Sequence, residues 1–155
     1  MTGGRPTATG RRPLRHLWVA REAVAAVEFA MLAVPFLMLS LGTFEIGRLM
    51  WTSEALEATA AIGARCMGVL SSSCASGGAY SATNTTSYIL AVAGDWNIGL
   101  TSADLTLTPS GTCGGVGGFS QVTINYTFQT ALPSLLTSLA SGVAMSVQAC
   151  FPNQS

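Results

Sequence analysis

The feature that most constrains this chain is a continuous apolar run from Ala23 to Phe44, AVAAVEFAMLAVPFLMLSLGTF. The run has 22 residues and a single charge, Glu28. A helix rises about 1.5 Å per residue, so one of this length crosses a hydrocarbon core of about 30 Å. The run is longer than the apolar part of a cleaved secretory signal, and no small-residue cleavage site follows it closely. We therefore predict a retained transmembrane helix over residues 23–47.

The charges of the chain are distributed unevenly on the two sides of this run. The first 21 residues hold five arginines and no acid, a charge of +5, and the remainder carries −5. Charged residues make up only 9% of the chain, against about 25% in typical soluble domains. A basic segment before an apolar run favours membrane orientation over nucleic-acid binding. We predict a flexible cytoplasmic leader over residues 1–22 and a domain on the other side of the membrane over residues 48–155.

The helix is expected to continue beyond the membrane. The segment from Arg48 to Leu70 is rich in alanine and has no proline. Apolar residues recur in it at helical spacing: Leu49, Leu56, Ala60, Gly63, Met67 and Leu70. Pro35 removes one backbone donor, so we expect a bend near residues 31–35. The pattern predicts one helix from Ala23 to about Leu70.

A small mixed domain should follow the helix. A Ser/Gly loop at residues 71–80 ends the helix, and a short second helix is expected around residues 88–93. Alternating apolar and polar positions then predict short strands at 105–108, 121–129 and 143–150, with a flexible glycine-rich loop at 111–118 and a connector at 129–141. The fold class is therefore α+β, with a short antiparallel sheet.

The four cysteines, Cys66, Cys74, Cys113 and Cys150, lie beyond the predicted span. They form no CxxC pair and match no common zinc spacing, so we expect disulfides and no metal site. Four cysteines allow three pairings. We favour Cys66–Cys74, because the Ser/Gly loop can fold back on the helix end. We favour Cys113–Cys150, because antiparallel pairing of the last two strands brings those positions together.

We find no catalytic constellation in the sequence. The only histidine, His16, lies in the leader, and the chain has no lysine. Asp95 and Asp104 are isolated acids in expected loops. The glycine-rich stretch Gly111–Gly118 is not followed by the Lys-Ser/Thr and helix that a phosphate-binding loop needs. The sequence therefore predicts no enzyme and no cofactor.

Glu28 admits two interpretations. A carboxylate at the bilayer centre costs about 2.5–3.5 kcal/mol on insertion scales, and less near an interface. Glu28 can lie near the cytoplasmic interface and reach towards Arg21. Alternatively, cleavage between Ala23 and Val24 creates a charged α-amino group four residues before Glu28, on the same helix face. The residues alone leave both interpretations open.

Residues 21–65 resemble the TadE-like family of minor pseudopilins. The resemblance rests on AVEFA at 26–30, the proline at 35, EIGR at 45–48 and the closing AR at 64–65. The C-terminal part is similar to the cysteine-bearing members. In those, a cysteine (here Cys113) precedes a V-x-x-x-Y-x-F strand (here 122–128) and the chain ends in A-C-[FY]-P (here 149–152).

This resemblance implies a pilin-like fold and a structural, non-catalytic part in assembling a tight-adherence (Tad) pilus at a bacterial inner membrane. The implied partners are the lipid bilayer, other minor pseudopilins, the pilus assembly platform and a prepilin peptidase that cuts between Ala23 and Val24. Such peptidases generally favour glycine where this chain has Ala23. Glu28 would set axial register, and structural roles fall to Pro35, Glu45 and Arg48. The alternative is a single-pass inner-membrane protein with a periplasmic binding domain unrelated to pili.

Overall fold

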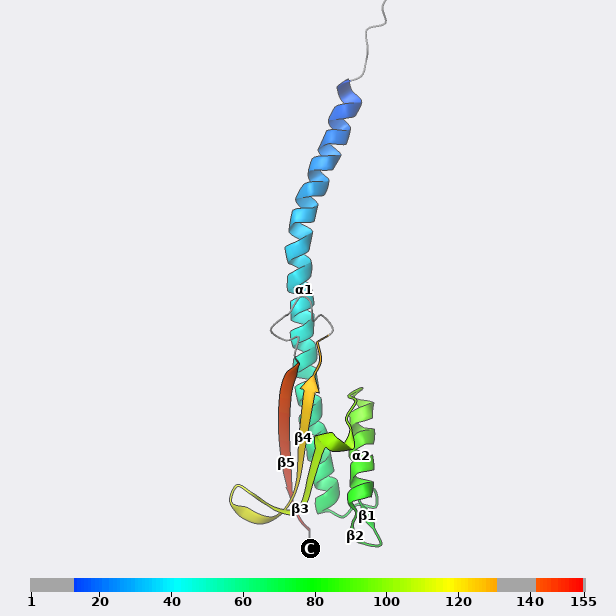
Figure 1. Cartoon of the computed structure of the whole chain (residues 1–155), viewed down its shortest axis with the longest axis vertical. Coiled ribbons are helices and arrows are strands. Elements are labelled where there is room, and N and C mark those ends of the chain that lie inside the picture. The colour runs from blue at the N-terminus through cyan, green and yellow to red at the C-terminus, as the bar shows by residue number, and fades with distance from the viewer. Residues whose placement is uncertain (1–12, 131–141, 155) are drawn as a thin grey trace, which may run out of the picture. The chain divides into compact units, whose positions relative to one another are not determined.

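The structure is a computed structural model that describes residues 13–130 and 142–154, with side chains described from residue 24 onward. It divides into two compact units, Met1–Phe44 and Glu45–Ser155 (Figure 1). Helix α1, Pro13–Gly68, contributes to both. The expected flexible leader is therefore wrong from residue 13 onward, because the helix begins ten residues before Ala23. A proline suits the first helical position, since its fixed φ is already helical.

The part of α1 in the second unit buries one face. This face consists of Ala55, Leu56, Thr59, Ala60, Gly63, Ala64 and Met67. Four members of the predicted stripe belong to it, but Leu70 is 41% exposed. The helix ends at Gly68 in a Schellman motif, in which Ser71 N donates to Cys66 O and Leu70 N donates to Met67 O. Leu70 adopts the left-handed conformation of that motif, with φ of 49°, and so leaves the apolar stripe.

Three antiparallel strands in the order β3-β4-β5 pack against this helix face (Figure 1). They are β3, Leu105–Cys113, β4, Val116–Phe128, and β5, Val143–Pro152. The alternation on β4 buries Ser120, Val122, Ile124 and Phe128. β5 pairs with β4 from Phe128↔Val143 to Phe119↔Pro152. All three strands are longer than predicted, because backbone pairing continues past the apolar positions that identify a strand in sequence.

The glycine-rich stretch at 111–118 is not the predicted flexible loop. β3 continues to Cys113 and β4 begins at Val116, so only Gly114 and Gly115 form the turn. Both have positive φ, at 60° and 83°, as the central residues of a type I′ hairpin turn must. The glycines therefore allow a tight hairpin, which the sequence analysis interpreted as a break in structure.

A second helix and a small hairpin complete the second unit. Helix α2 covers Ala82–Asp95, well beyond the predicted 88–93, and Ser81 caps its N-terminus by accepting from Asn84 N. The Ser/Gly loop contains two two-residue strands, β1, Ala75–Ser76, and β2, Ala79–Tyr80. A 3₁₀ turn, η1 (Ser102–Asp104), leads into β3. Most of the expected connector, 131–141, lies outside the described residues. The observed fold is α+β and pilin-like, as the sequence predicts.

Candidate functional site

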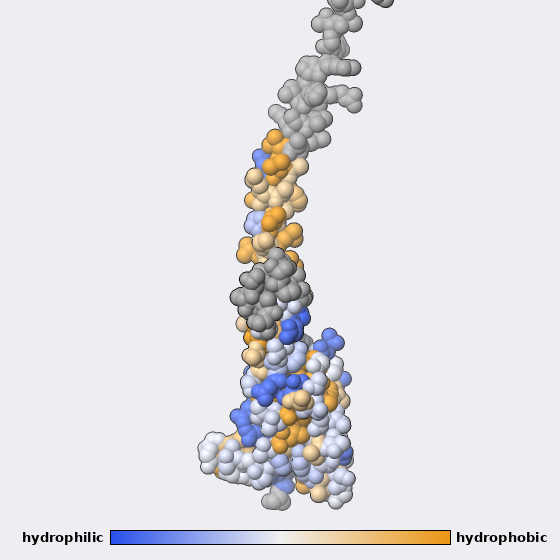
Figure 2. Space-filling model, in the orientation of Figure 1, coloured by the Kyte–Doolittle hydropathy of each residue, from blue (hydrophilic) through white to orange (hydrophobic). Residues whose placement is uncertain are grey.

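The first candidate surface is the segment of α1 from Val24 to Phe44. Its apolar side chains point outward, and the stem above the domain is largely orange in Figure 2. Phe29, Met31 and Leu39 are 73–74% exposed. Over the described residues, one helix is long and apolar enough to cross a membrane, and its most apolar window is not buried within the chain. Only lipid or another protein can cover such a surface in water. The chain thus has one N-terminal membrane-span candidate, consistent with an anchored pilin.

The side-chain hydroxyls in this segment are hydrogen-bonded in a way that suits lipid. The helix is continuous across Pro35, and the predicted bend there stays a prediction. The hydroxyl of Ser40 donates to Phe36 O at 2.9 Å, and that of Thr43 donates to Leu39 O at 2.8 Å. Because these hydroxyls bond to the helix itself, they need no water. Glu28 is then the one charged side chain between residues 24 and 44.

Glu28 and Val24 lie one helical turn apart, and both side chains are exposed. Four residues correspond to about 6 Å along a helix axis. Among the side chains that the structure describes, no cation lies within ion-pair distance of the Glu28 carboxylate. The side chains of Arg21 and Ala23 fall outside that range. The geometry therefore leaves the Glu28 carboxylate accessible to a charged group from outside the helix.

An ion pair with a buried carboxylate lies at the start of the second unit. The Glu45 side chain is only 2% exposed, and Nη1 of Arg48 lies 2.9 Å and 3.1 Å from its two carboxylate oxygens. The Arg48 guanidinium also lies over the Phe128 ring, 5.3 Å from its centroid. Burying a carboxylate is costly unless a cation accompanies it. The pair therefore lets a charged residue join the face of α1 that packs on the end of β4.

The sequence analysis assigned Glu45 and Arg48 to a structural role but missed Phe128 as their partner. Phe128 lies far along the chain from Arg48 and is 4% exposed. A cation over an aromatic face contributes about 0.5–1 kcal/mol when exposed and more when desolvated. The only sequence signal was the last apolar position of a predicted strand, which does not reveal what the ring contacts.

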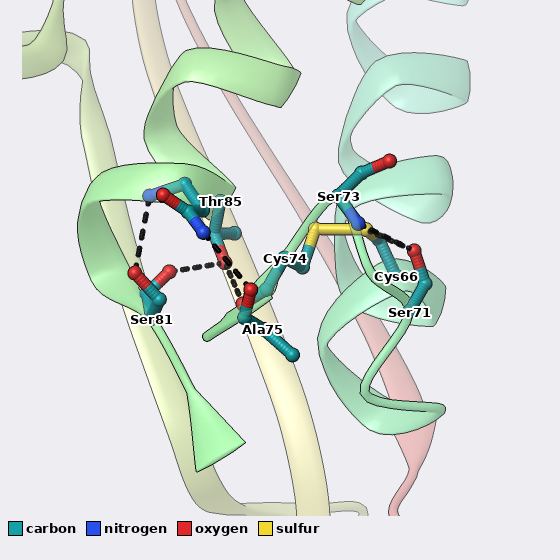
Figure 3. The surroundings of a disulfide bond; sticks show 8 residues. Cys66, Ser71, Ser73, Cys74, Ala75, Ser81 and Thr85 are labelled. Atoms are coloured by element: carbon teal, nitrogen blue, oxygen red, sulfur yellow. Dashed lines mark hydrogen bonds between the residues drawn. A yellow bond between two sulfur atoms is a disulfide. The ribbon is translucent and has the colours of Figure 1, made fainter. Parts of the chain in front are cut away.

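The second unit contains two disulfides, which join different elements. Cys66, in the last turn of α1, pairs with Cys74 in the loop that follows, with Cα atoms 5.9 Å apart. Around this bond, the Thr85 hydroxyl lies 2.8 Å from Ser81 O and 3.3 Å from Cys74 O (Figure 3). The disulfide links this loop to α1, and the Thr85 hydroxyl links the first turn of α2 to the same loop. The disulfide therefore fixes the junction between the two helices.

The second disulfide joins Cys113 to Cys150, with Cα atoms 6.5 Å apart. These cysteines belong to β3 and β5, which lie on opposite sides of β4 in the sheet order. Register shifts on either side of Gly111 curl the end of the hairpin, so the bond can cross β4. The sequence analysis favoured both of these pairings, and the structure contains both.

Asp95 and Asp104, the two isolated acids of the sequence analysis, both lie among the described residues. No group of three or more His, Cys, Asp and Glu side chains among them could hold a metal ion. Asp104 caps η1, with one carboxylate oxygen 2.7 Å from Thr101 N and 2.8 Å from the Thr101 hydroxyl. Asp95 is the exposed last residue of α2. The predicted isolated acids are therefore turn and helix-end residues.

Comparison with protein-family models matches residues 23–65 to the family described as TadE-like protein. The matched segment lies entirely within α1 and contains both the Glu28 surface and the Glu45–Arg48 ion pair. No curated protein and no solved structure was found to match the chain.

Proposed function

We propose that this chain, a TadE-like protein over residues 23–65, is a minor pseudopilin that takes part in assembling a Tad pilus at a bacterial inner membrane. One observation carries the proposal: the exposed apolar surface of residues 24–44, with its single carboxylate at Glu28. Such a surface needs lipid before assembly and neighbouring helices after it. The family match indicates a structural protein and no catalytic family.

The proposed orientation places residues 1–22 in the cytoplasm and residues 48–155 in the periplasm. Five arginines precede the span, and the positive-inside rule retains such a flank in the cytoplasm. Both disulfides lie on the other side of the span, where an oxidising periplasm supports them. Charge and cysteine chemistry therefore support the same orientation independently.

In the proposed function, cleavage between Ala23 and Val24 creates the charged group that Glu28 binds. The new α-amino group has a pKa of about 7.7–8.0 and is charged at neutral pH. Opposite unit charges 4 Å apart attract by about 4 kcal/mol at an effective dielectric constant of 20. An exposed Glu28 can therefore accept the amine of a neighbouring subunit and fix the axial register between two helices. The other minor pseudopilins and the assembly platform are the proposed partners.

The processing step is tested by intact-mass and N-terminal sequencing of membrane-extracted protein from cells with and without the prepilin peptidase. We expect a mature chain that begins at Val24 only when the peptidase is present. Ala23→Gly should increase the cut fraction, because these peptidases generally favour glycine before the cut. A chain that still begins at Met1 in cells with active peptidase refutes the processing step.

The register role is tested with Glu28→Gln, which keeps the shape and removes the charge. We expect normal membrane insertion and a loss of surface pili, measured by immunoblot of sheared pilin. Glu57→Gln is the matched control, because Glu57 is an exposed acid on the same helix outside the apolar segment. Equal piliation in both variants would contradict the register role and favour the alternative of a single-pass membrane protein with a periplasmic binding domain.

A further inference from the structure

The second unit carries one cation that none of its own acids neutralises. From Glu45 onward the chain has five acids and two arginines. Arg48 is paired with Glu45, whereas Arg65 is exposed, and no acid among the described residues lies within ion-pair distance of it. Arg65 suits the last turn of α1, because a cation there meets the negative end of the helix dipole. Its guanidinium donors remain accessible to a carboxylate from outside the chain.

An acid without a cation lies on the same face of α1. Glu54 is exposed, and no cation among the described side chains lies within ion-pair distance of it. At 100° per residue, Glu54 and Arg65 lie about 20° apart around the helix, on the side opposite the buried Leu56. Along the axis they are about 16 Å apart at 1.5 Å per residue, which is too far for them to pair within one chain. This face of α1 therefore presents a carboxylate and a guanidinium that do not neutralise each other.

Apolar groups surround the place where a carboxylate from outside would meet Arg65. Arg65 lines an open groove of about 270 Å³ together with Ile62, Val69 and Tyr88. Tyr88 belongs to α2, so the groove lies between the two helices of the second unit. Ion pairs that are partly buried are screened by salt much less than fully exposed pairs. The groove therefore strengthens the attraction between Arg65 and an acid that enters it.

We propose that this face of α1 binds a second copy of the chain, with Arg65 of one copy against Glu54 of the next. A second copy is the partner that the charges favour, because a face with both signs of charge is complementary to itself. Copies anchored in one membrane share a direction, so the inference rests on the anchoring in the proposed function. Parallel copies bring the two side chains level when they are displaced by about 16 Å along α1. The contact joins unlike surfaces, so it can continue along a row of copies.

This contact differs from the one proposed for Glu28. The Glu28 carboxylate of one subunit and the Val24 amine of its neighbour are level at a displacement of about 6 Å, four residues of helix. The contact between Arg65 and Glu54 needs about 16 Å, so the two contacts join a chain to different neighbours. A variant can therefore lose one contact and keep the other.

Energy transfer between copies in a bilayer measures this association. Full-length chains with a monomeric donor or acceptor fluorescent protein at the C-terminus are mixed in phosphatidylcholine vesicles, and transfer is followed as the protein-to-lipid ratio rises. Arg65→Glu and Glu54→Arg should each weaken the association about tenfold, because each places like charges opposite one another. The double variant should restore the association, because the same pair forms with its charges exchanged. Added salt should weaken the association of the wild-type chain.

The matched control combines Arg65→Glu with Glu57→Arg. Glu57 is also an exposed acid of α1, but it lies about 60° around the helix from Glu54, so it should not restore the association. Because all three positions are exposed, the variants should keep the wild-type Tm and the Cys66–Cys74 bond. Restoration by Glu57→Arg instead of Glu54→Arg overturns the proposed contact, and so do single variants that associate as the wild type does.

Flotation of the chain with the vesicles separates the two ways in which transfer can be absent. A wild-type chain that floats with the vesicles but shows no transfer at any protein-to-lipid ratio overturns the contact between copies. A chain that does not float with the vesicles overturns the anchoring in the proposed function instead.

Discussion

Gly63 provides a direct test of how closely the two helices approach. A Cβ built on its backbone lies 2.7 Å from Cδ1 and 2.8 Å from Cγ1 of Ile89 on α2. Ile89 is fully buried and β-branched, so its side chain has few alternative rotamers and no route into solvent. The alanine methyl group must therefore push the helices apart or strain Ile89.

The expected magnitude follows from two opposing terms. Alanine gains about 1 kcal/mol over glycine inside a helix. Adding a methyl group to a packed core costs about 1–3 kcal/mol. Gly63→Ala should therefore lower the free energy of unfolding by roughly 0–2 kcal/mol. Gly47→Ala is the matched control on the same helix, because nothing lies within 4 Å of its Cβ position. That control should gain about 1 kcal/mol.

Thermal unfolding of the full chain in detergent, followed by near-ultraviolet circular dichroism, measures this difference. For a domain near 100 residues, 1 kcal/mol shifts Tm by roughly 4–8 °C. Gly47→Ala should raise Tm, and Gly63→Ala should leave it unchanged or lower it. In an Ile89→Ala background, which itself costs about 2–5 kcal/mol, Gly63→Ala should become stabilising because the methyl group enters the new cavity. If Gly63→Ala raises Tm in the wild-type background as much as Gly47→Ala does, the close helix approach is refuted.

The remaining predictions concern topology, the second disulfide and the Glu45–Arg48 ion pair. Alkaline phosphatase fused to the C-terminus should be active, and an inactive fusion to a chain that is made and inserted would reverse the orientation. Non-reducing peptide mapping should recover Cys113 linked to Cys150, and replacing both by serine should cost about 4 kcal/mol of stability by loop entropy. Arg48→Ala should lower the free energy of unfolding by about 2 kcal/mol, measured by thermal unfolding. This is less than the usual loss for a buried pair, because the Arg48 side chain is 39% exposed. An unchanged Tm would show that the Glu45 carboxylate does not need the Arg48 guanidinium.

The sequence predicted what is encoded by local periodicity. The apolar stripe through Leu56, Ala60 and Met67 identified the buried face of α1, because helical spacing alone determines which residues share a face. Alternation identified the inner face of β4 at Val122 and Ile124 for the same reason. The fold class followed from the order of these elements. The presence of disulfides followed from the even number of cysteines beyond the predicted membrane span.

The sequence did not predict features that depend on contacts between distant segments. Nothing near Trp51 indicates that Trp96 lies beside it, and nothing near Arg48 indicates Phe128. The hairpin at Gly114 was missed because paired positive φ angles form a turn only when the flanking strands find each other. The sequence did identify Glu28 as a candidate functional residue, because a single carboxylate within an apolar run is costly to place in a membrane.

The different spans of the two disulfides have a consequence for the order of events during secretion. Cys66 and Cys74 are 8 positions apart, whereas Cys113 and Cys150 are 37 apart. If the chain crosses the membrane from the N-terminal side onward, the first bond can close while most of the sheet is still untranslocated. The second must wait for β5, which also supplies the pairing that completes β4. In the proposed orientation, Cys113 stays unpaired until then, beside an already closed Cys66–Cys74 loop. Because the Cys66–Cys74 bond can form before Cys113 and Cys150 cross the membrane, neither of these later cysteines can mispair with Cys66 or Cys74.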